Sequence, residues 1–128
     1  MAEPRADYIA ASELATALRR TADARPVVID VRDEDFVGGH IRGAVNVPEW
    51  QFRDDDFVDQ LVEKYRHAPQ IVFHCMFSQV RGPRCANRFL QRVQSLLEES
   101  ERPRVQVLVG GYTRFEETYR GEADLFEL

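Results

Sequence analysis

The sequence contains no long apolar segment and only two cysteines, and each shortage excludes a class of protein. No apolar run among the 128 residues approaches the roughly 20 residues that a membrane-spanning helix needs. The first residues, Met1–Asp7, lack the apolar stretch of a secretory signal, so we expect a cytosolic or nuclear protein. Two cysteines are too few for the disulfide framework of a small secreted domain, and we expect both to be reduced.

Metal ligands, linkers and repeats are also scarce. The three histidines show no zinc-ligand spacing toward Cys75 and Cys85, so no metal cofactor is expected. The chain has no internal repeat, low-complexity tract or Gly/Ser linker, and its length suits one domain over residues 1–128. A net charge of −5 argues against nucleic acid as a partner, and no membrane partner is expected; the oligomeric state stays open.

Acidic residues are missing from one long segment, between Ile71 and Leu97. The same segment carries four arginines: Arg81, Arg84, Arg88 and Arg92. This pattern indicates either a local anion site or a basic helix face that pairs with acidic neighbours, and charge alone favours the second interpretation.

Short β-branched runs alternate with helical patterns along the chain. Three runs predict buried strands: Pro26–Val31, Ile71–Phe73 and Val105–Val109. Helical spacing predicts four helices: one capped by Ser12, one with the acidic residues Asp54–Asp56 at its start, one from Pro83 to Leu97, and one carrying Tyr112, Phe115 and Tyr119. A further short strand is predicted near Ala44–Val47. Strands that alternate with helices predict an α/β fold with a central parallel sheet covered on both faces.

Ligands of such sheets bind beyond the carboxyl ends of the strands, which selects the loop Cys75–Arg81. The loop amides of Met76, Phe77, Ser78, Gln79 and Val80 can point inward and form a nest for an anion. The start of the next helix adds unpaired amides, and Arg81 can bind two oxygens at once. The same positive surroundings favour the thiolate of Cys75, which is the nucleophilic form. The alternative is a buried structural cysteine before an ordinary turn.

Several segments of the chain resemble motifs of a known family. The segment His74–Pro83, with the sequence HCMFSQVRGP, resembles the active-site signature of the cell-division-cycle dual-specificity phosphatases. It is also similar to that of their small single-domain relatives in fungi and plants, several of which act as arsenate reductases. Three further parts of the chain resemble motifs of the same family. Ile29–Arg32 resembles its strand ending in Asp-x-Arg, Gly39–Pro48 resembles its second signature, and Gly110–Tyr112 with Phe115 resembles its C-terminal motif. The resemblance implies a rhodanese-like fold, with Cys75 and Arg81 as the catalytic residues.

The chain departs from the phosphatase pattern at several positions. Met76 and Val80 stand where these phosphatases commonly carry acidic residues, so a proton donor must come from elsewhere or from the substrate. Glu116 and Glu117 are possible donors, although we favour their interpretation as solvated helix residues. The protective second thiol of these phosphatases is missing, because its position holds Val31. Cys85 is a possible resolving thiol for Cys75, and packing is its favoured role.

Three further residues are expected to support the site. Asp30 and Arg32 are expected to pair structurally beneath the loop. His74 is expected either to orient or polarise the thiolate region or simply to pack.

Four functions are compatible with the sequence, and we place them in a definite order. The first is a phosphatase that acts on phosphotyrosine or a similar aryl phosphate. Its expected partner is a phosphorylated protein or a small oxyanion substrate. The second is an arsenate reductase that uses the same cysteine with glutathione and glutaredoxin. A non-enzymatic binding module comes third, although the intact Cys75 and Arg81 argue against it, and sulfur transfer comes last, because true rhodaneses have a loop one residue shorter.

Overall fold

The computed structural model describes residues 4–128. Its strands and helices follow one another in this order: β1 (Asp7–Ile9), α1 (Ala11–Leu18), β2 (Val27–Asp30), β3 (His40–Ile41), β4 (Val45–Asn46), α2 (Asp55–Tyr65), β5 (Gln70–His74), α3 (Arg81–Leu96), β6 (Arg104–Leu108), α4 (Gly111–Tyr119) and β7 (Phe126–Glu127). Within the described range, no helix has the length and apolar character needed to cross a bilayer.

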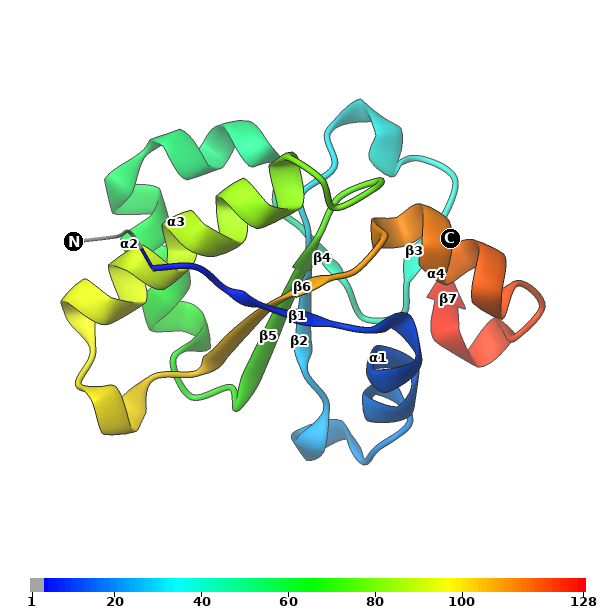
Figure 1. The fold of residues 1–128 in the computed structure, drawn as a ribbon, viewed down its shortest axis with the longest axis horizontal. Helices are drawn as coiled ribbons and strands as arrows, with labels where there is room; N and C mark the ends of the chain where they lie inside the picture. The colour runs from blue at the N-terminus through cyan, green and yellow to red at the C-terminus, as the bar shows by residue number, and fades with distance from the viewer. Residues whose placement is uncertain (1–3) are drawn as a thin grey trace.

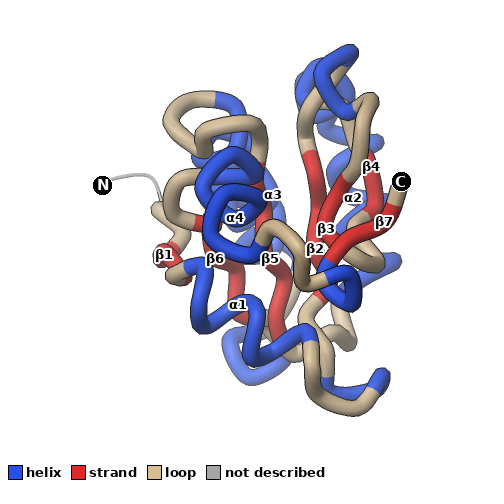
Figure 2. Tube along the Cα trace, turned by 90° about the vertical axis from the view of Figure 1, so that its right-hand side faces the viewer, coloured by secondary structure: helices blue, strands red, loops and turns tan. Residues whose placement is uncertain are grey.

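Five of the strands form one parallel sheet, with the order β1-β6-β5-β2-β4 (Figure 1). Helices α2 and α3 cover one face of this sheet, and α1 and α4 cover the other (Figure 2). Strands β3 and β7 form a separate antiparallel pair beside α4. The predicted α/β class with a central parallel sheet is therefore confirmed.

The three central strands are buried on both faces because successive side chains point to opposite sides of the sheet. Ile29 and Phe73 pack with α2 and α3, whereas Val28 and Val72 pack with α1 and α4. All four side chains are at most 2% exposed. This double burial explains why the strands are continuous apolar runs in the sequence.

Some boundaries differ from the sequence prediction. Ser12 does not cap α1: the N-cap is Ala10, whose N–H donates to the Glu13 carboxylate at 3.1 Å. Glu13 thereby supplies the acidic half of a capping box, and the Ala10 side chain makes no capping hydrogen bond. The apolar spacing of residues 83–97 would place Leu96 toward the core, but this side chain is 47% exposed because α3 ends there.

The edge strand β1 and the pair β3 and β7 were not predicted, because each has only two or three residues. The predicted acidic helix start is confirmed, since the Asp54 carboxylate accepts from Asp56 N–H at the start of α2.

The carboxyl ends of β2 and β5 lie side by side, since Asp30 pairs with His74 in the parallel register. The chain leaves β5 through the Cys75–Arg81 loop and enters α3 at Arg81. The loop after β2 and the loop after β5 therefore meet at one edge of the sheet.

Candidate active site

The Cys75 sulfur lies inside the Cys75–Arg81 loop and accepts two backbone hydrogen bonds. The N–H groups of Ser78 and Gly82 both donate to Cys75 Sγ at 3.2 Å. One donor belongs to the loop, and the other belongs to the first turn of α3, where helical N–H groups have no partner of their own. Cys75 is only 3% exposed, so a reactant reaches the sulfur only by entering the loop.

The N-terminus of α4 holds the loop from behind. Tyr112 N–H donates to the Cys75 carbonyl at 3.0 Å, and Thr113 N–H donates to the Met76 carbonyl at 2.9 Å. These two carbonyls are thereby turned toward α4 rather than into the hollow of the loop. A carbonyl in the hollow would repel an anion, so this arrangement supports an anion site.

Gly111 makes this contact possible. It has a φ of +61°, and a Cβ placed on it would lie 2.6 Å from the Met76 carbonyl oxygen and 2.7 Å from that of Cys75. No other residue type fits without displacing the loop. The Gly110-Gly111 pair, which the sequence marked only as part of a C-terminal motif, is thus a structural support of the site.

The tightest turn of the loop is at Ser78, the one non-glycine residue with positive φ in the described chain, at +54°. An αL conformation at a serine is strained and persists only where surrounding contacts enforce it. Here it directs the Ser78 N–H to the sulfur. The Ser78 hydroxyl is buried and has no hydrogen-bond partner among residues 4–128.

The Arg81 guanidinium is not unpaired: it forms a bidentate ion pair with Asp35. Nη1 donates to Asp35 Oδ1 at 3.0 Å, and Nη2 donates to Oδ2 at 2.7 Å. Asp35 lies in a 3₁₀ turn, Glu34–Phe36, that follows β2. The Arg81 guanidinium lowers the pKa of the Asp35 carboxyl, mainly through these hydrogen bonds, and Asp35 raises the pKa of Arg81.

Asp30 and Arg32 form a buried pair next to the loop. The Arg32 guanidinium donates to both Asp30 carboxylate oxygens, with Nη2 at 2.7 Å from Oδ2. Arg32 also donates to the carbonyls of Gly39 and Asp35, and it lies 4.2 Å from the centre of the Tyr112 ring. A buried charge pair of this kind needs its remaining donors satisfied, and these contacts satisfy them. The pairing anticipated for these two residues is present.

His74 is fully buried between this pair and the loop. Its Nδ1 lies 3.0 Å from the Cys75 carbonyl, and its Nε2 lies 3.6 Å from Asp30 Oδ2 without a hydrogen bond. Burial lowers the pKa of His74, which favours the neutral ring at neutral pH. The ring packs against Tyr112, and its Nδ1 orients the backbone at Cys75. Within residues 4–128, no hydrogen bond joins the His74 ring to the Cys75 sulfur.

Cys85 lies in the first turns of α3 and is fully buried. Burial raises the pKa of its thiol far above the ordinary value, so the sulfur stays neutral and poorly nucleophilic. Both cysteines are free thiols. These observations support the packing role over the resolving role.

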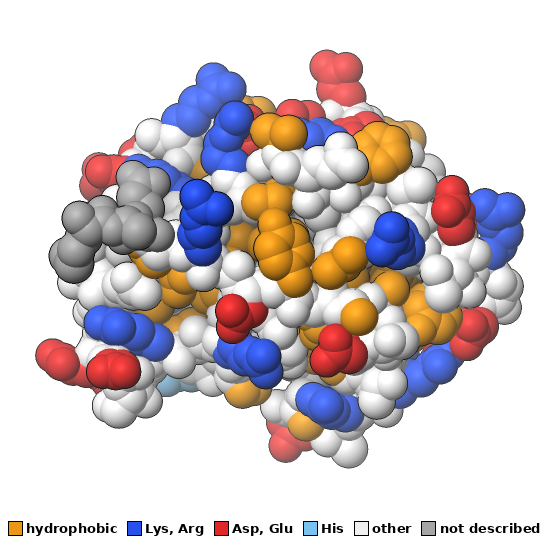
Figure 3. Space-filling view, viewed as in Figure 1, with side chains coloured by type: hydrophobic (Ala, Val, Ile, Leu, Met, Phe, Trp, Pro, Cys, Tyr) orange, Lys and Arg blue, Asp and Glu red, His pale blue; other side chains and the backbone are white. Residues whose placement is uncertain are grey.

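The outer side of the loop is open and partly apolar. Phe77 and Val80 are 57% and 58% exposed, and apolar side chains stand at this edge of the molecule (Figure 3). The carboxylates considered as proton donors lie elsewhere. Glu116 pairs with Arg120 on α4 at 3.0 Å, and Glu117 is exposed on the same helix.

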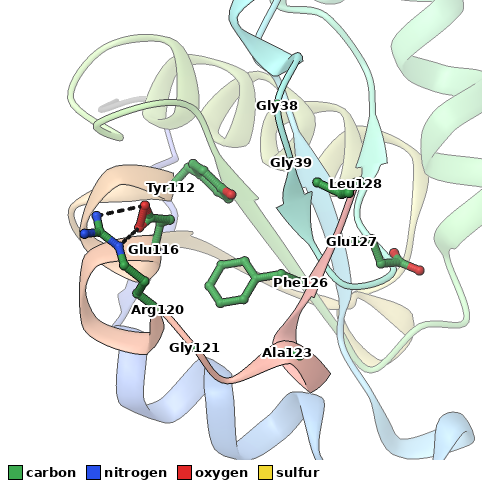
Figure 4. Close-up of a pocket in the computed structure, with 10 residues that line it drawn as sticks. All are labelled: Gly38, Gly39, Tyr112, Glu116, Arg120, Gly121, Ala123, Phe126, Glu127 and Leu128. Carbon is green, nitrogen blue, oxygen red and sulfur yellow. Dashed lines mark hydrogen bonds and ion pairs between the residues drawn. The ribbon is translucent and has the colours of Figure 1, made fainter.

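A cavity of about 280 Å³ lies on the other side of α4, between that helix and the β3–β7 pair (Figure 4). Tyr112, Phe126 and the Glu116–Arg120 pair are among its lining residues. Cys75 and Arg81 do not line it. No group of three or more His, Cys, Asp or Glu side chains that could hold a metal ion occurs within residues 4–128.

The structure thus brings most of the predicted residues to one place. Cys75, Arg81, His74 and the Asp30–Arg32 pair meet at the carboxyl ends of β5 and β2. Sequence reasoning missed Asp35 and the α4 amides. Both had a signal: Asp35 follows the strand next to β5, and Gly110-Gly111 follows β6, the strand on its other side.

Comparisons with known proteins agree with this geometry. Residues 11–118 match the model of the rhodanese-like domain. A dual specificity phosphatase, Cdc25, of Arabidopsis thaliana is 34% identical over 110 residues, which cover 85% of this chain and 72% of that protein.

Two solved structures extend the likeness. A yeast protein tyrosine phosphatase of the rhodanese family superposes with a TM-score of 0.77 at 29% identity, covering 98% of this chain and 94% of that one. The As-Sb reductase of Leishmania major gives a TM-score of 0.80 at 32% identity, covering 89% and 79%. The chain therefore belongs to the rhodanese-like domain family, and within it to the group whose relatives are named as Cdc25-like phosphatases and arsenate reductases.

Proposed function

We propose that the protein is a cysteine-dependent phosphatase that hydrolyses phosphate monoesters, with Cys75 as nucleophile and Arg81 as the oxyanion-binding side chain. One observation carries this proposal: the amides of Ser78 and Gly82 both point at Cys75 Sγ. Two N–H donors on one sulfur stabilise a thiolate, and they surround the place where a tetrahedral anion would enter. The loop carbonyls that would oppose this are bound to α4.

The reaction follows from this arrangement in two steps. The Cys75 thiolate attacks phosphorus, a sulfur–phosphorus bond forms, and the bond from phosphorus to the ester oxygen breaks. The loop amides and the Arg81 guanidinium bind the equatorial oxygens, where charge is held during transfer. Water then attacks the cysteinyl-phosphate, which releases inorganic phosphate and restores the thiolate.

The side chains at the loop restrict which leaving groups can depart, because Met76, Val80 and Asp35 do not donate a proton. Met76 and Val80 carry no proton to donate, and Asp35 is held ionised by Arg81. A leaving group must therefore depart as an anion, or take the proton of a phosphate monoanion. Aryl oxides leave readily as anions and alkyl oxides do not, so phosphotyrosine and other aryl phosphates are the favoured substrates. Proteins that carry phosphotyrosine are therefore candidate substrates.

Arsenate reduction is the second candidate, favoured by the 32% identity to a structure named As-Sb reductase. Arsenate has the shape and charge of phosphate, so the same loop suits it. Cys75 would form a sulfur–arsenic bond as water leaves. The buried, neutral Cys85 is a poor second thiol, so the two electrons would come from glutathione, with glutaredoxin completing the reaction.

A parallel assay of both reactions tests the proposal. Purified protein is offered para-nitrophenyl phosphate, an alkyl phosphate, and arsenate with glutathione and glutaredoxin. We expect hydrolysis of the aryl ester, at least tenfold slower hydrolysis of the alkyl ester, and complete loss with Cys75→Ser. Arsenate reduction without phosphatase turnover would replace the first candidate by the second. Full phosphatase turnover by Cys75→Ser would refute the cysteine mechanism for both.

A further inference from the structure

The Asp35–Arg81 ion pair is a feature that the proposed chemistry does not by itself require. Arg81 could have pointed freely into the loop or into solvent, because its side chain is 29% exposed. Instead, both terminal nitrogens are bound by the carboxylate of Asp35, in the 3₁₀ turn that follows β2, at 3.0 and 2.7 Å. A two-pronged pair fixes the plane of the guanidinium as well as its place.

The geometry of the pair leaves part of the guanidinium available. Arginine has five N–H donors, and Asp35 takes one from Nη1 and one from Nη2. Within the part of the chain that the structure describes, Nε–H of Arg81 donates to no protein group. A guanidinium has a second two-donor edge, formed by Nε–H and the remaining N–H of one terminal nitrogen. An oxyanion can therefore bind Arg81 without breaking its pair with Asp35.

Asp35 itself is held rigidly. Its backbone carbonyl accepts from Arg32 Nη1 at 3.2 Å, and its carboxylate accepts from Asp33 N–H at 3.0 Å. Arg32 is in turn fixed on Asp30, with 2% of its side chain exposed. A continuous chain of hydrogen bonds thus runs from the buried end of β2, through the backbone carbonyl of Asp35, to the guanidinium of Arg81.

This series of contacts explains the spacing of Asp30, Arg32 and Asp35 in the sequence. The first two form the buried anchor, and the 3₁₀ turn carries the third outward to Arg81. Among the residues that the structure describes, the Asp30 carboxylate accepts hydrogen bonds from Arg32 and not from Arg81.

We propose that Asp35 is the positioning residue for Arg81: it fixes the terminal nitrogens so that the free edge of the guanidinium is presented to the oxyanion held by the loop. This inference rests on the proposed oxyanion-binding role of Arg81. It excludes the opposite role, in which Asp35 imitates the substrate and must be displaced from Arg81. The two roles predict opposite effects when the carboxylate is removed.

The test compares three variants of the full-length protein. Asp35→Asn keeps the shape of the side chain and removes its charge. Asp33→Asn is the matched control, since Asp33 lies in the same acidic turn, is exposed, and makes no ion pair with Arg81. Asp35→Glu restores a carboxylate and serves as the conservative rescue.

We measure kcat and KM on para-nitrophenyl phosphate, inhibition by orthovanadate, and calorimetric binding of inorganic phosphate. A misplaced catalytic group lowers turnover by about 10- to 100-fold, so Asp35→Asn should lower kcat by that factor. Orthovanadate, which adopts the five-coordinate geometry of the transition state, should lose affinity by about the same factor. Binding of phosphate should weaken by a smaller factor, because the loop amides remain. Asp35→Glu should recover part of kcat, and Asp33→Asn should match the unmodified protein.

Tighter phosphate binding by Asp35→Asn, with unchanged or faster turnover, would show that Asp35 competes with substrate and would overturn the proposal. Equal losses in Asp33→Asn and Asp35→Asn would also overturn it, since the effect would then be one of general charge. The binding measurement needs no turnover. It therefore separates a failure of this inference from a failure of the phosphatase assignment, which would show as phosphate binding without hydrolysis.

Discussion

Substituting Gly111 by alanine should disable the site from the side opposite to the substrate. Gly111 contributes no functional group, and its role is to let the α4 amides approach the Cys75–Arg81 loop. An added Cβ would lie 2.6 Å from the Met76 carbonyl oxygen, where ordinary contacts begin at 3.4 Å. The loop and the helix must therefore separate by about 0.8 Å, the difference between these two distances.

Two energy terms follow from this separation. A left-handed conformation costs an alanine about 1 kcal/mol relative to glycine. The hydrogen bonds that the N–H groups of Tyr112 and Thr113 donate to the loop carbonyls are each worth about 1 kcal/mol, and both are stretched or lost. We expect a total loss of about 3 kcal/mol in the free energy of unfolding. A displacement of about 1 Å at a reacting group lowers the rate by about 100-fold, so kcat should fall by about that factor.

Gly43→Ala is the matched control. Gly43 has a similar φ of +77°, but a Cβ placed there meets nothing within 4 Å. It should lose only the backbone term of about 1 kcal/mol and keep its turnover. Urea unfolding and hydrolysis of para-nitrophenyl phosphate per folded molecule measure both effects. If Gly111→Ala matched Gly43→Ala in stability and in kcat, the support of the loop by α4 would be refuted.

Two further predictions concern the buried groups around the site. Because burial raises the pKa of Cys85 in the folded protein, the unfolded chain loses this proton above about pH 9 while the folded chain keeps it; stability should fall by up to about 1.4 kcal/mol per pH unit there. Urea unfolding between pH 8 and pH 10.5 should show a shallower decline for Cys85→Ala, and identical slopes would contradict the assigned environment. Arg32→Met leaves Asp30 buried without its partner and should cost about 3–5 kcal/mol in unfolding free energy. Adding Asp30→Asn should restore part of this loss in a double-mutant cycle, whereas additive losses would argue against the pair.

The sequence predicted the layers of the fold because those depend on burial. Strands β2, β5 and β6 are buried on both faces, so their apolar runs are continuous and visible. The pairing of β3 with β7 is different. It joins residues far apart along the chain through two residues on each side, and such short strands leave no periodic signal.

The candidate site was predictable where chemistry concentrates in one segment, and less so where it depends on contacts between segments. The loop from Cys75 to Arg81 is contiguous, so its amides, thiol and guanidinium could be identified together. Asp35 was hidden in an acidic run that also suits a solvated turn, and only the register of β2 beside β5 brings it to Arg81. Ser12 was misjudged as the helix cap because its hydroxyl suits that role, whereas α1 begins at Ala11 and Ser12 lies inside its first turn.

The dependence of the loop on α4 has a consequence for the life of the nascent chain. When the segments of β5 and α3 have been synthesised, the Cys75 thiol and the Arg81 guanidinium are already present. The amides that bind the loop carbonyls belong to α4, which is still to be synthesised. Until that helix docks, no α4 amide holds the carbonyls of Cys75 and Met76 away from the hollow of the loop, so the anion site around the sulfur is incomplete. The order of synthesis thus completes the anion site only after the α4 segment has been made.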